Sequence, residues 1–187
     1  MSDSIKNQLK IEAFKTYLPR LEDCLIQILN QQAVDVKSAI IGFDEGVYIF
    51  IENGNPIYVG RTNRMSKRLR EHFRGSHYSA HFAFNIAREN TKITGINRSK
   101  LLNDAVFKKA FDEAKERVAA MQLKYIPIKD DILQALFEIY AAIELKTTPN
   151  TTNAIDGHFS DLKNKLRNHN GLSKERKMKF IDGFFKA

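Results

Sequence analysis

The first part of the chain has the apolar spacing of helices. Between Ile5 and Asn30 apolar residues recur every three or four positions, and Pro19 is placed to separate or kink two helices. The residues that carry this pattern are Ile11, Phe14, Leu18, Leu21, Leu25, Ile28 and Leu29. The pattern predicts an amino-terminal helical extension over residues 1–43.

The pattern becomes strand-like at Gly46. Two short apolar runs, at 47–51 and 57–59, are separated by a polar stretch that contains Asn53, Gly54 and Pro56. A linker of this length and composition is typical of a hairpin. We therefore expect two neighbouring antiparallel strands.

A short amphipathic helix is predicted after the second strand. Asn63 is placed to cap it, and apolar residues then repeat every four positions, at Met65, Leu69 and Phe73. Arg68 and His72 are also four residues apart, so they share a neighbouring face of this helix.

The second half of the chain predicts more helices and one more strand. Residues 79–88 are typical of a helix, 94–99 of a loop and 103–119 of a clearer helix. Residues 121–128 alternate and are rich in branched and aromatic side chains, which indicates a third strand. Asp130 or Asp131 then caps a strongly apolar helix that ends near Lys146. The expected fold class is α/β (α+β), a small mixed three-stranded sheet flanked by helices, followed by a loop at 147–153.

Composition and charge narrow the class of protein. At 187 residues, 43% of them hydrophobic and 28% charged, the chain is long enough for one core with appendages. Its formal net charge of +8 favours a polyanionic partner. Cys24 is the single cysteine, which excludes an internal disulfide framework and fits a reducing compartment. No stretch reaches the roughly twenty apolar residues of a membrane span. We expect a soluble cytoplasmic protein with a basic helical tail at 159–187.

Candidate chemistry gathers around the two predicted strands. Six Lys or Arg residues lie between Arg61 and Arg74 with Glu71 as the opposing charge. This run is either a solvated helix face or a surface for phosphates. Tyr48 and Tyr58 lie near corresponding points of the two strands, where tyrosine packing alone is an ordinary explanation. The convergence of two phenols with Arg61, Arg68 and His72 on one corner of the sheet suits phosphoryl chemistry.

Two glutamates interrupt the apolar helix that follows Asp131. Glu138 and Glu144 would each cost several kcal/mol inside a core unless paired, hydrogen-bonded or bound to a metal. A salt bridge or an outward-facing position is the more common explanation for a glutamate on a helix.

Read together, these residues resemble the GIY-YIG nuclease superfamily. Its two tripeptides correspond to Gly46-Val47-Tyr48 and Tyr58-Val59-Gly60, and the resemblance continues through Arg61, Arg68, His72 and Glu138. It covers about residues 44–158, with a helical insert at about 75–120, and is strongest to stand-alone bacterial members.

The resemblance implies a nuclease that hydrolyses DNA with one divalent ion, Mg²⁺ or Mn²⁺. Glu138 would bind the metal, Tyr48 would be the general base and Tyr58 a second phenol that positions water or substrate. Arg61 and the metal would favour a phenolate, and Arg68 would neutralise charge on the scissile phosphate. His72 would orient the nucleophile, contact phosphate or share the base role. The residues implied to bind nucleic acid are Gly60, Arg61, Arg64, Lys67, Arg68 and Arg70.

One asparagine of the site has two candidate positions. Counting forward from Glu138 at the family's interval leads to Asn150, whereas counting back from the Asn-x-Ile-Asp-Gly-His segment leads to Asn153, which we favour. His77, His81 and His158 are possible substrate contacts. A DNA-binding module without catalysis and a nuclease that acts on RNA are the alternative functions.

Overall fold

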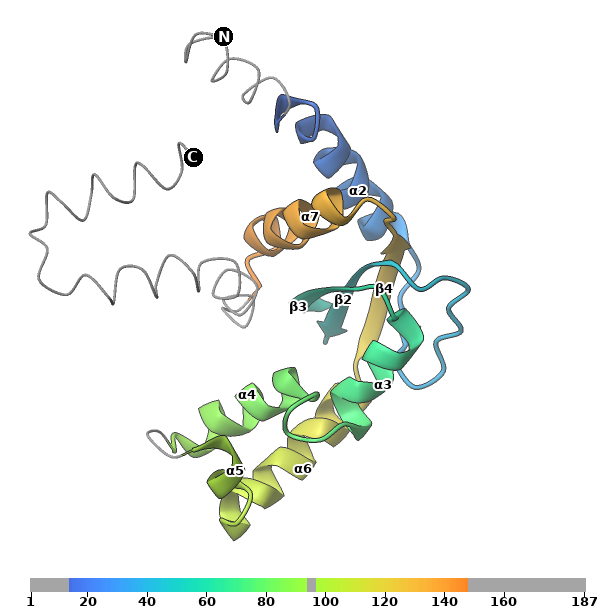
Figure 1. Ribbon diagram of the computed structural model, residues 1–187. Helices are drawn as coiled ribbons and strands as arrows, with labels where there is room; N and C mark the ends of the chain where they lie inside the picture. The colour runs from blue at the N-terminus through green and yellow to red at the C-terminus, as the bar shows by residue number, and fades with distance from the viewer. Residues whose placement is uncertain (1–13, 94–96, 148–187) are drawn as a thin grey trace, which may run out of the picture. The chain divides into compact units, whose positions relative to one another are not determined.

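The computed structural model describes residues 14–93 and 97–147, which form helices around one small sheet (Figure 1). The elements of this part are α2 (Leu18–Asn30), β1 (Val34–Asp35), β2 (Gly46–Glu52), β3 (Asn55–Thr62), α3 (Met65–Arg74), α4 (His81–Thr91), α5 (Arg98–Leu101), α6 (Ala105–Ala119), β4 (Gln122–Pro127) and α7 (Asp131–Glu144). The expected fold class is confirmed. None of the helices described is long and apolar enough to cross a membrane.

The sheet differs from the expected one in two details. Its strand order is β1-β4-β2-β3, and the pairings are all antiparallel rather than mixed. The additional strand, β1, has only two residues and lies inside the segment predicted to be helical. Asn53 and Gly54 join β2 to β3 with positive φ angles of 51° and 78°, the conformation that a two-residue hairpin turn with the right twist requires.

The two faces of the sheet belong to different cores. Helices α3, α4 and α6 lie on one face of the sheet, and α2 and α7 lie on the other (Figure 1). Tyr48 and Phe50 belong to the core on the first face, whereas Val47 and Ile49 belong to the core on the second. This alternation follows from the two-residue period of a strand. Since helices cover both faces, residues 46–51 of the central strand β2 are buried throughout.

Some of the helices begin at a side-chain cap and others do not. Asp130 caps α7, because its Oδ1 accepts hydrogen bonds from the backbone N–H groups of Ile132 (3.1 Å) and Leu133 (3.0 Å). The expectation that Asn63 caps α3 is wrong: Arg64 occupies that position and no side chain caps the helix. The Asn63 side chain instead accepts a hydrogen bond from Gln134 of α7 (3.1 Å), which ties the two helices together.

Candidate active site

Gly60 gives the two tyrosines their place on the sheet. Tyr48 lies opposite Gly60, and Phe50 lies opposite Tyr58, so both phenols are on the same face. A Cβ atom at Gly60 would lie 2.5 Å from the Tyr48 hydroxyl oxygen and 2.8 Å from Cε1 of Tyr58. Only glycine therefore leaves room for the Tyr48 phenol to cross the edge strand β3.

Tyr48 is paired with a buried histidine. Its hydroxyl oxygen lies 2.6 Å from Nε2 of His72, and both residues are 0% exposed. His72 is enclosed by aromatic rings, with centroid distances of 5.0 Å to Phe50, 5.5 Å to Tyr58 and 6.4 Å to Phe82. Within the described part of the chain its Nδ1 atom has no hydrogen-bond partner. Burial, with the positive charge of Arg68, holds the pKa of His72 well below 6.5.

Arg68 is the cation beside the two phenols. Its Nη1 donates to the carbonyl oxygen of Ser79 (2.7 Å) and lies 3.4 Å from Oε2 of Glu71. Burial raises the pKa of Tyr48 well above 10 and also raises that of Tyr58, and the Arg68 guanidinium opposes both shifts. A phenolate is therefore disfavoured in the structure as it stands. The expected positions of Arg68 and His72, together on one face of α3 above the tyrosines, agree with this geometry.

Arg61 and Glu138 form an ion pair on the other face of the sheet. Arg61 lies opposite Val47, whose side chain points toward α7, and its Nε is 3.2 Å from Oε2 of Glu138. Glu138 is 8% exposed, and burial raises the pKa of its carboxyl group against the lowering effect of Arg61. Arg61 was expected to favour a phenolate, but it forms its ion pair with Glu138. The cation that lowers the pKa values of Tyr48 and Tyr58 is Arg68.

Charged groups on the two faces of the sheet influence one another. Strand β3 is an edge strand, and the charge of Glu138 reaches far enough to raise the pKa values of both Tyr48 and Tyr58. Arg68 in turn lowers the pKa of Glu138. The carboxylate, the phenols and the arginine thus belong to one electrostatic unit.

The remaining predicted site residues fall into three groups. Lys67 and Arg70 are exposed on α3, and Arg64 is exposed at its N-cap, available to phosphates or simply solvated. Glu144 is exposed at the end of α7, as an ordinary surface glutamate would be. The site asparagine candidates and one histidine, Asn150, Asn153 and His158, lie outside the described residues.

Sequence patterns alone did not identify two neighbours of the site. Phe82 stacks on Tyr58 at a centroid distance of 4.5 Å and closes the aromatic cage. Arg98, in a segment expected to be a loop, donates from Nη1 to Nδ1 of His81 (3.1 Å). The aromatic residues of the 79–88 helix were a usable signal for Phe82, whereas nothing local to Arg98 indicates its partner.

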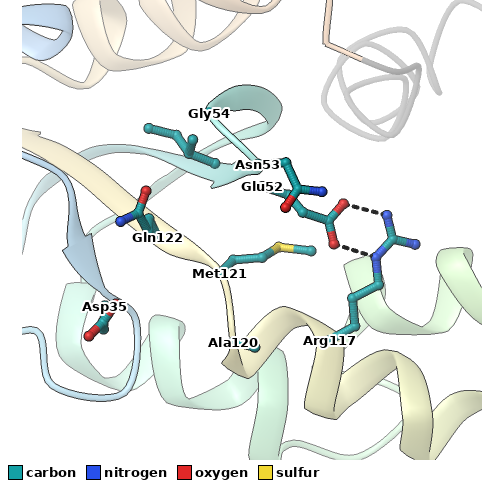
Figure 2. A pocket seen from close by; sticks show the side chains of 9 residues that line it. Asp35, Glu52, Asn53, Gly54, Arg117, Ala120, Met121 and Gln122 are labelled. Carbon is teal, nitrogen blue, oxygen red and sulfur yellow. Dashed lines mark hydrogen bonds and ion pairs between the residues drawn. The ribbon is translucent and has the colours of Figure 1, made fainter.

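A cleft of about 450 Å³ is lined by Ile51 and Glu52, the last two residues of β2 (Figure 2). Glu52 and Arg117 join across two side-chain hydrogen bonds of 2.7 and 2.6 Å at this cleft. Asp35 is a further charged residue of its lining. Because its arginine is already neutralised by a carboxylate, this cleft offers no counterpart to the cationic corner at Gly60.

The comparison with known families agrees with the geometry of this corner. Residues 44–117 match the family model described as the GIY-YIG catalytic domain, a range that holds both tripeptides, Arg68 and His72. The range ends before α7, so the place of Glu138 rests on the structure. Curated proteins and solved structures gave no significant match. The match over residues 44–117 supports membership of this chain in the GIY-YIG nuclease superfamily.

Proposed function

We propose that this protein is an endonuclease that hydrolyses phosphodiester bonds in DNA with one bound divalent metal ion, Mg²⁺ or Mn²⁺. Its GIY-YIG domain indicates nuclease activity on nucleic acids. The observation that carries the proposal is the buried 2.6 Å contact between Tyr48 and His72 at a corner where Arg68 and Glu138 also act.

Glu138 fits a metal ion of this kind. Burial raises the pKa of its carboxyl group, so a cation bound there would stabilise the charged form. Residues 14–93 and 97–147 contain no cluster of three or more His, Cys, Asp or Glu side chains arranged for a metal. A single carboxylate suits Mg²⁺, which keeps several waters, better than it suits Zn²⁺. When bound, the ion would polarise the scissile phosphate and stabilise the leaving oxygen.

Tyr48 and His72 together can take the proton of the attacking water. In the tautomer that has its ring hydrogen on Nδ1, Nε2 of His72 accepts the hydrogen of the Tyr48 hydroxyl, 2.6 Å away. With the pKa of Tyr48 well above 10, a standing phenolate is not available at neutral pH. Tyr48 therefore accepts the water proton while its own proton passes to His72. The lowered pKa of His72 keeps its ring neutral until that moment. Of the three roles considered for His72, this geometry favours a share in the base role.

Arg68 and the exposed basic residues of α3 supply the positive charge for the substrate. Arg68 is held by the Ser79 carbonyl oxygen, so its guanidinium is fixed before the scissile phosphate arrives. Arg64, Lys67 and Arg70 would contact neighbouring phosphates of the backbone. These contacts read no bases, so we expect binding with weak sequence preference and a strong dependence on salt.

A cleavage panel tests the proposal. The full chain is incubated with supercoiled, linear, branched, flapped and single-stranded DNA and with RNA, with Mg²⁺, with Mn²⁺ and with EDTA. The proposal predicts metal-dependent cutting of at least one DNA form. Cutting of RNA alone would assign the other substrate class. Salt-dependent binding of DNA without cutting of any substrate would make the protein a binding module and refute the proposal.

A further inference from the structure

A second cluster of polar side chains adjoins the catalytic corner on its α4 side. His81 is the first residue of α4, and its neighbour Phe82 stacks directly on Tyr58. The carbonyl oxygen of Ser79, two residues earlier, accepts the 2.7 Å hydrogen bond from Arg68. His81 is also close enough to His72 to affect the pKa of His72. His81 thus lies next to the residues proposed to carry the reaction.

Arg98 fixes the orientation and the protonation of His81. Its Nη1 lies 3.1 Å from Nδ1 of His81. A guanidinium can only donate, so Nδ1 must be the acceptor and the ring hydrogen must be on Nε2. Burial lowers the pKa of His81, and the positive charges of Arg98 and Arg68 lower it further, which agrees with a neutral ring. His81 therefore has one N–H donor with a set direction.

Arg98 itself is a cation short of partners. Its guanidinium lies 4.0 Å from the centroid of the Phe84 ring, and Arg88 is close enough to lower its pKa. In the described part of the chain its Nε and Nη2 atoms are buried without hydrogen-bond partners. A partly buried cation beside a second arginine is unfavourable unless an anion approaches. The cluster is therefore electrostatically suited to an anionic ligand.

We propose that His81, held by Arg98, binds a backbone phosphate of the nucleic-acid substrate beside the scissile phosphate. His81 donates through Nε2–H, and Arg98 orients the ring and adds positive charge. This inference rests on the proposed function and names two residues for substrate binding that lie outside the tyrosine, arginine and glutamate corner.

Two substitutions of His81 separate its two nitrogen atoms. Binding of a labelled DNA duplex is measured in EDTA with the full chain carrying Glu138→Gln. His81→Asn keeps an acceptor near Nδ1 for Arg98 but lacks the distant donor, and we expect about tenfold weaker binding. His81→Gln places an amide N–H near the Nε2 position, and we expect binding within about threefold of the parent.

A charge-matched pair of substitutions tests Arg98. Arg98→Gln and Lys100→Gln each remove one positive charge from α5, but Lys100 is exposed and two positions away, so it points in another direction. We expect Arg98→Gln to weaken binding about tenfold and to reduce the slope of log affinity against log salt by about 0.9, as loss of one phosphate contact does. Lys100→Gln should change neither by as much. Thermal unfolding of each variant checks that it is folded.

The outcomes separate this inference from the proposed function. If the unsubstituted chain cuts DNA, but adding His81→Asn to the Glu138→Gln chain leaves its DNA binding unchanged, the inference is refuted and the proposed function stands. The same holds if Arg98→Gln and Lys100→Gln have equal effects. If the parent neither binds nor cuts nucleic acid, the proposed function itself is refuted. Selective loss in His81→Asn and Arg98→Gln supports the inference.

Discussion

Removal of one oxygen atom tests the proton path most sharply. Tyr48→Phe keeps the ring, which is 0% exposed, and deletes the hydroxyl that lies 2.6 Å from Nε2 of His72. The Nδ1 atom of His72 already lacks a hydrogen-bond partner among the described residues, and the substitution would remove the partner of Nε2 as well. Both ring nitrogens would then be unpaired within the described part of the chain. A lost hydrogen bond that leaves one buried polar atom unpaired lowers the free energy of unfolding by about 2 kcal/mol.

The effect of Tyr48→Phe on cleavage should be far larger than its effect on binding. Loss of a positioned general base lowers the rate of the chemical step by roughly 10²–10⁴-fold. Substrate affinity should stay within about twofold, because the hydroxyl is buried against His72 rather than presented on the basic surface of α3. Single-turnover plasmid cleavage measures the first quantity and binding in EDTA measures the second.

Tyr125→Phe is the matched control for this experiment. Tyr125 lies directly opposite Tyr48 on β4, and its hydroxyl donates to the carbonyl oxygen of Ile40 (3.2 Å) rather than to a site residue. The same atom is deleted from the next strand, so cleavage should stay within about threefold of the parent. Cutting by Tyr48→Phe at the parent rate, or an equal loss in Tyr125→Phe, would refute the proposed proton path.

Three further predictions concern Gly60, His72 and the anchoring of α7. Gly60→Ala would place Cβ 2.5 Å from the Tyr48 hydroxyl oxygen, so the phenol must move and cleavage should fall about a hundredfold; Gly42→Ala, with nothing within 4 Å, is the control in the same assay. Because the pKa of His72 is lowered on folding, the unfolded chain binds more protons than the folded chain below about pH 6.5. The free energy of unfolding should therefore fall as the pH drops from 6.5 toward the lowered pKa, by up to about 1.4 kcal/mol per pH unit. Urea unfolding at several pH values should show a weaker dependence of this free energy on pH for His72→Gln. Gln134→Ala removes a buried amide that donates to the Ile128 carbonyl oxygen (2.8 Å), and urea unfolding should show a loss of about 3 kcal/mol; an unchanged midpoint would contradict the reading of α7 as anchored through this residue.

Local patterns were sufficient for the hairpin and the first helix after it. The alternation of β2 and β3, the turn at Asn53 and Gly54 and the four-residue spacing of Arg68 and His72 depend on neighbours along the chain. For this reason the corner of the sheet and the family could be predicted. Strand β1 could not, because two residues are too few for any period to be visible.

Contacts between distant segments account for the errors. Asn63 has the side chain of a cap but bonds to Gln134, 71 positions away, which no local pattern reveals. Arg61 was expected beside Tyr48. In the sheet Arg61 lies opposite Val47, the residue before Tyr48 on β2, so Arg61 and Tyr48 are on opposite faces and Arg61 pairs with Glu138. The strand register that decides this comes from the folded sheet.

Glu138→Gln is the most direct test of the central claim that this is a metal-dependent nuclease with its metal at Glu138. The substitution keeps the size of a side chain that is 8% exposed, and Glu144→Gln, at an exposed position of the same helix, is the control. Plasmid cleavage with Mg²⁺ and duplex binding in EDTA are measured for both variants and the parent. The account predicts that Glu138→Gln loses cutting by about a thousandfold and keeps binding, while Glu144→Gln does both as the parent does. Parent-like cutting by Glu138→Gln, or undiminished cutting by the parent in EDTA, would contradict it.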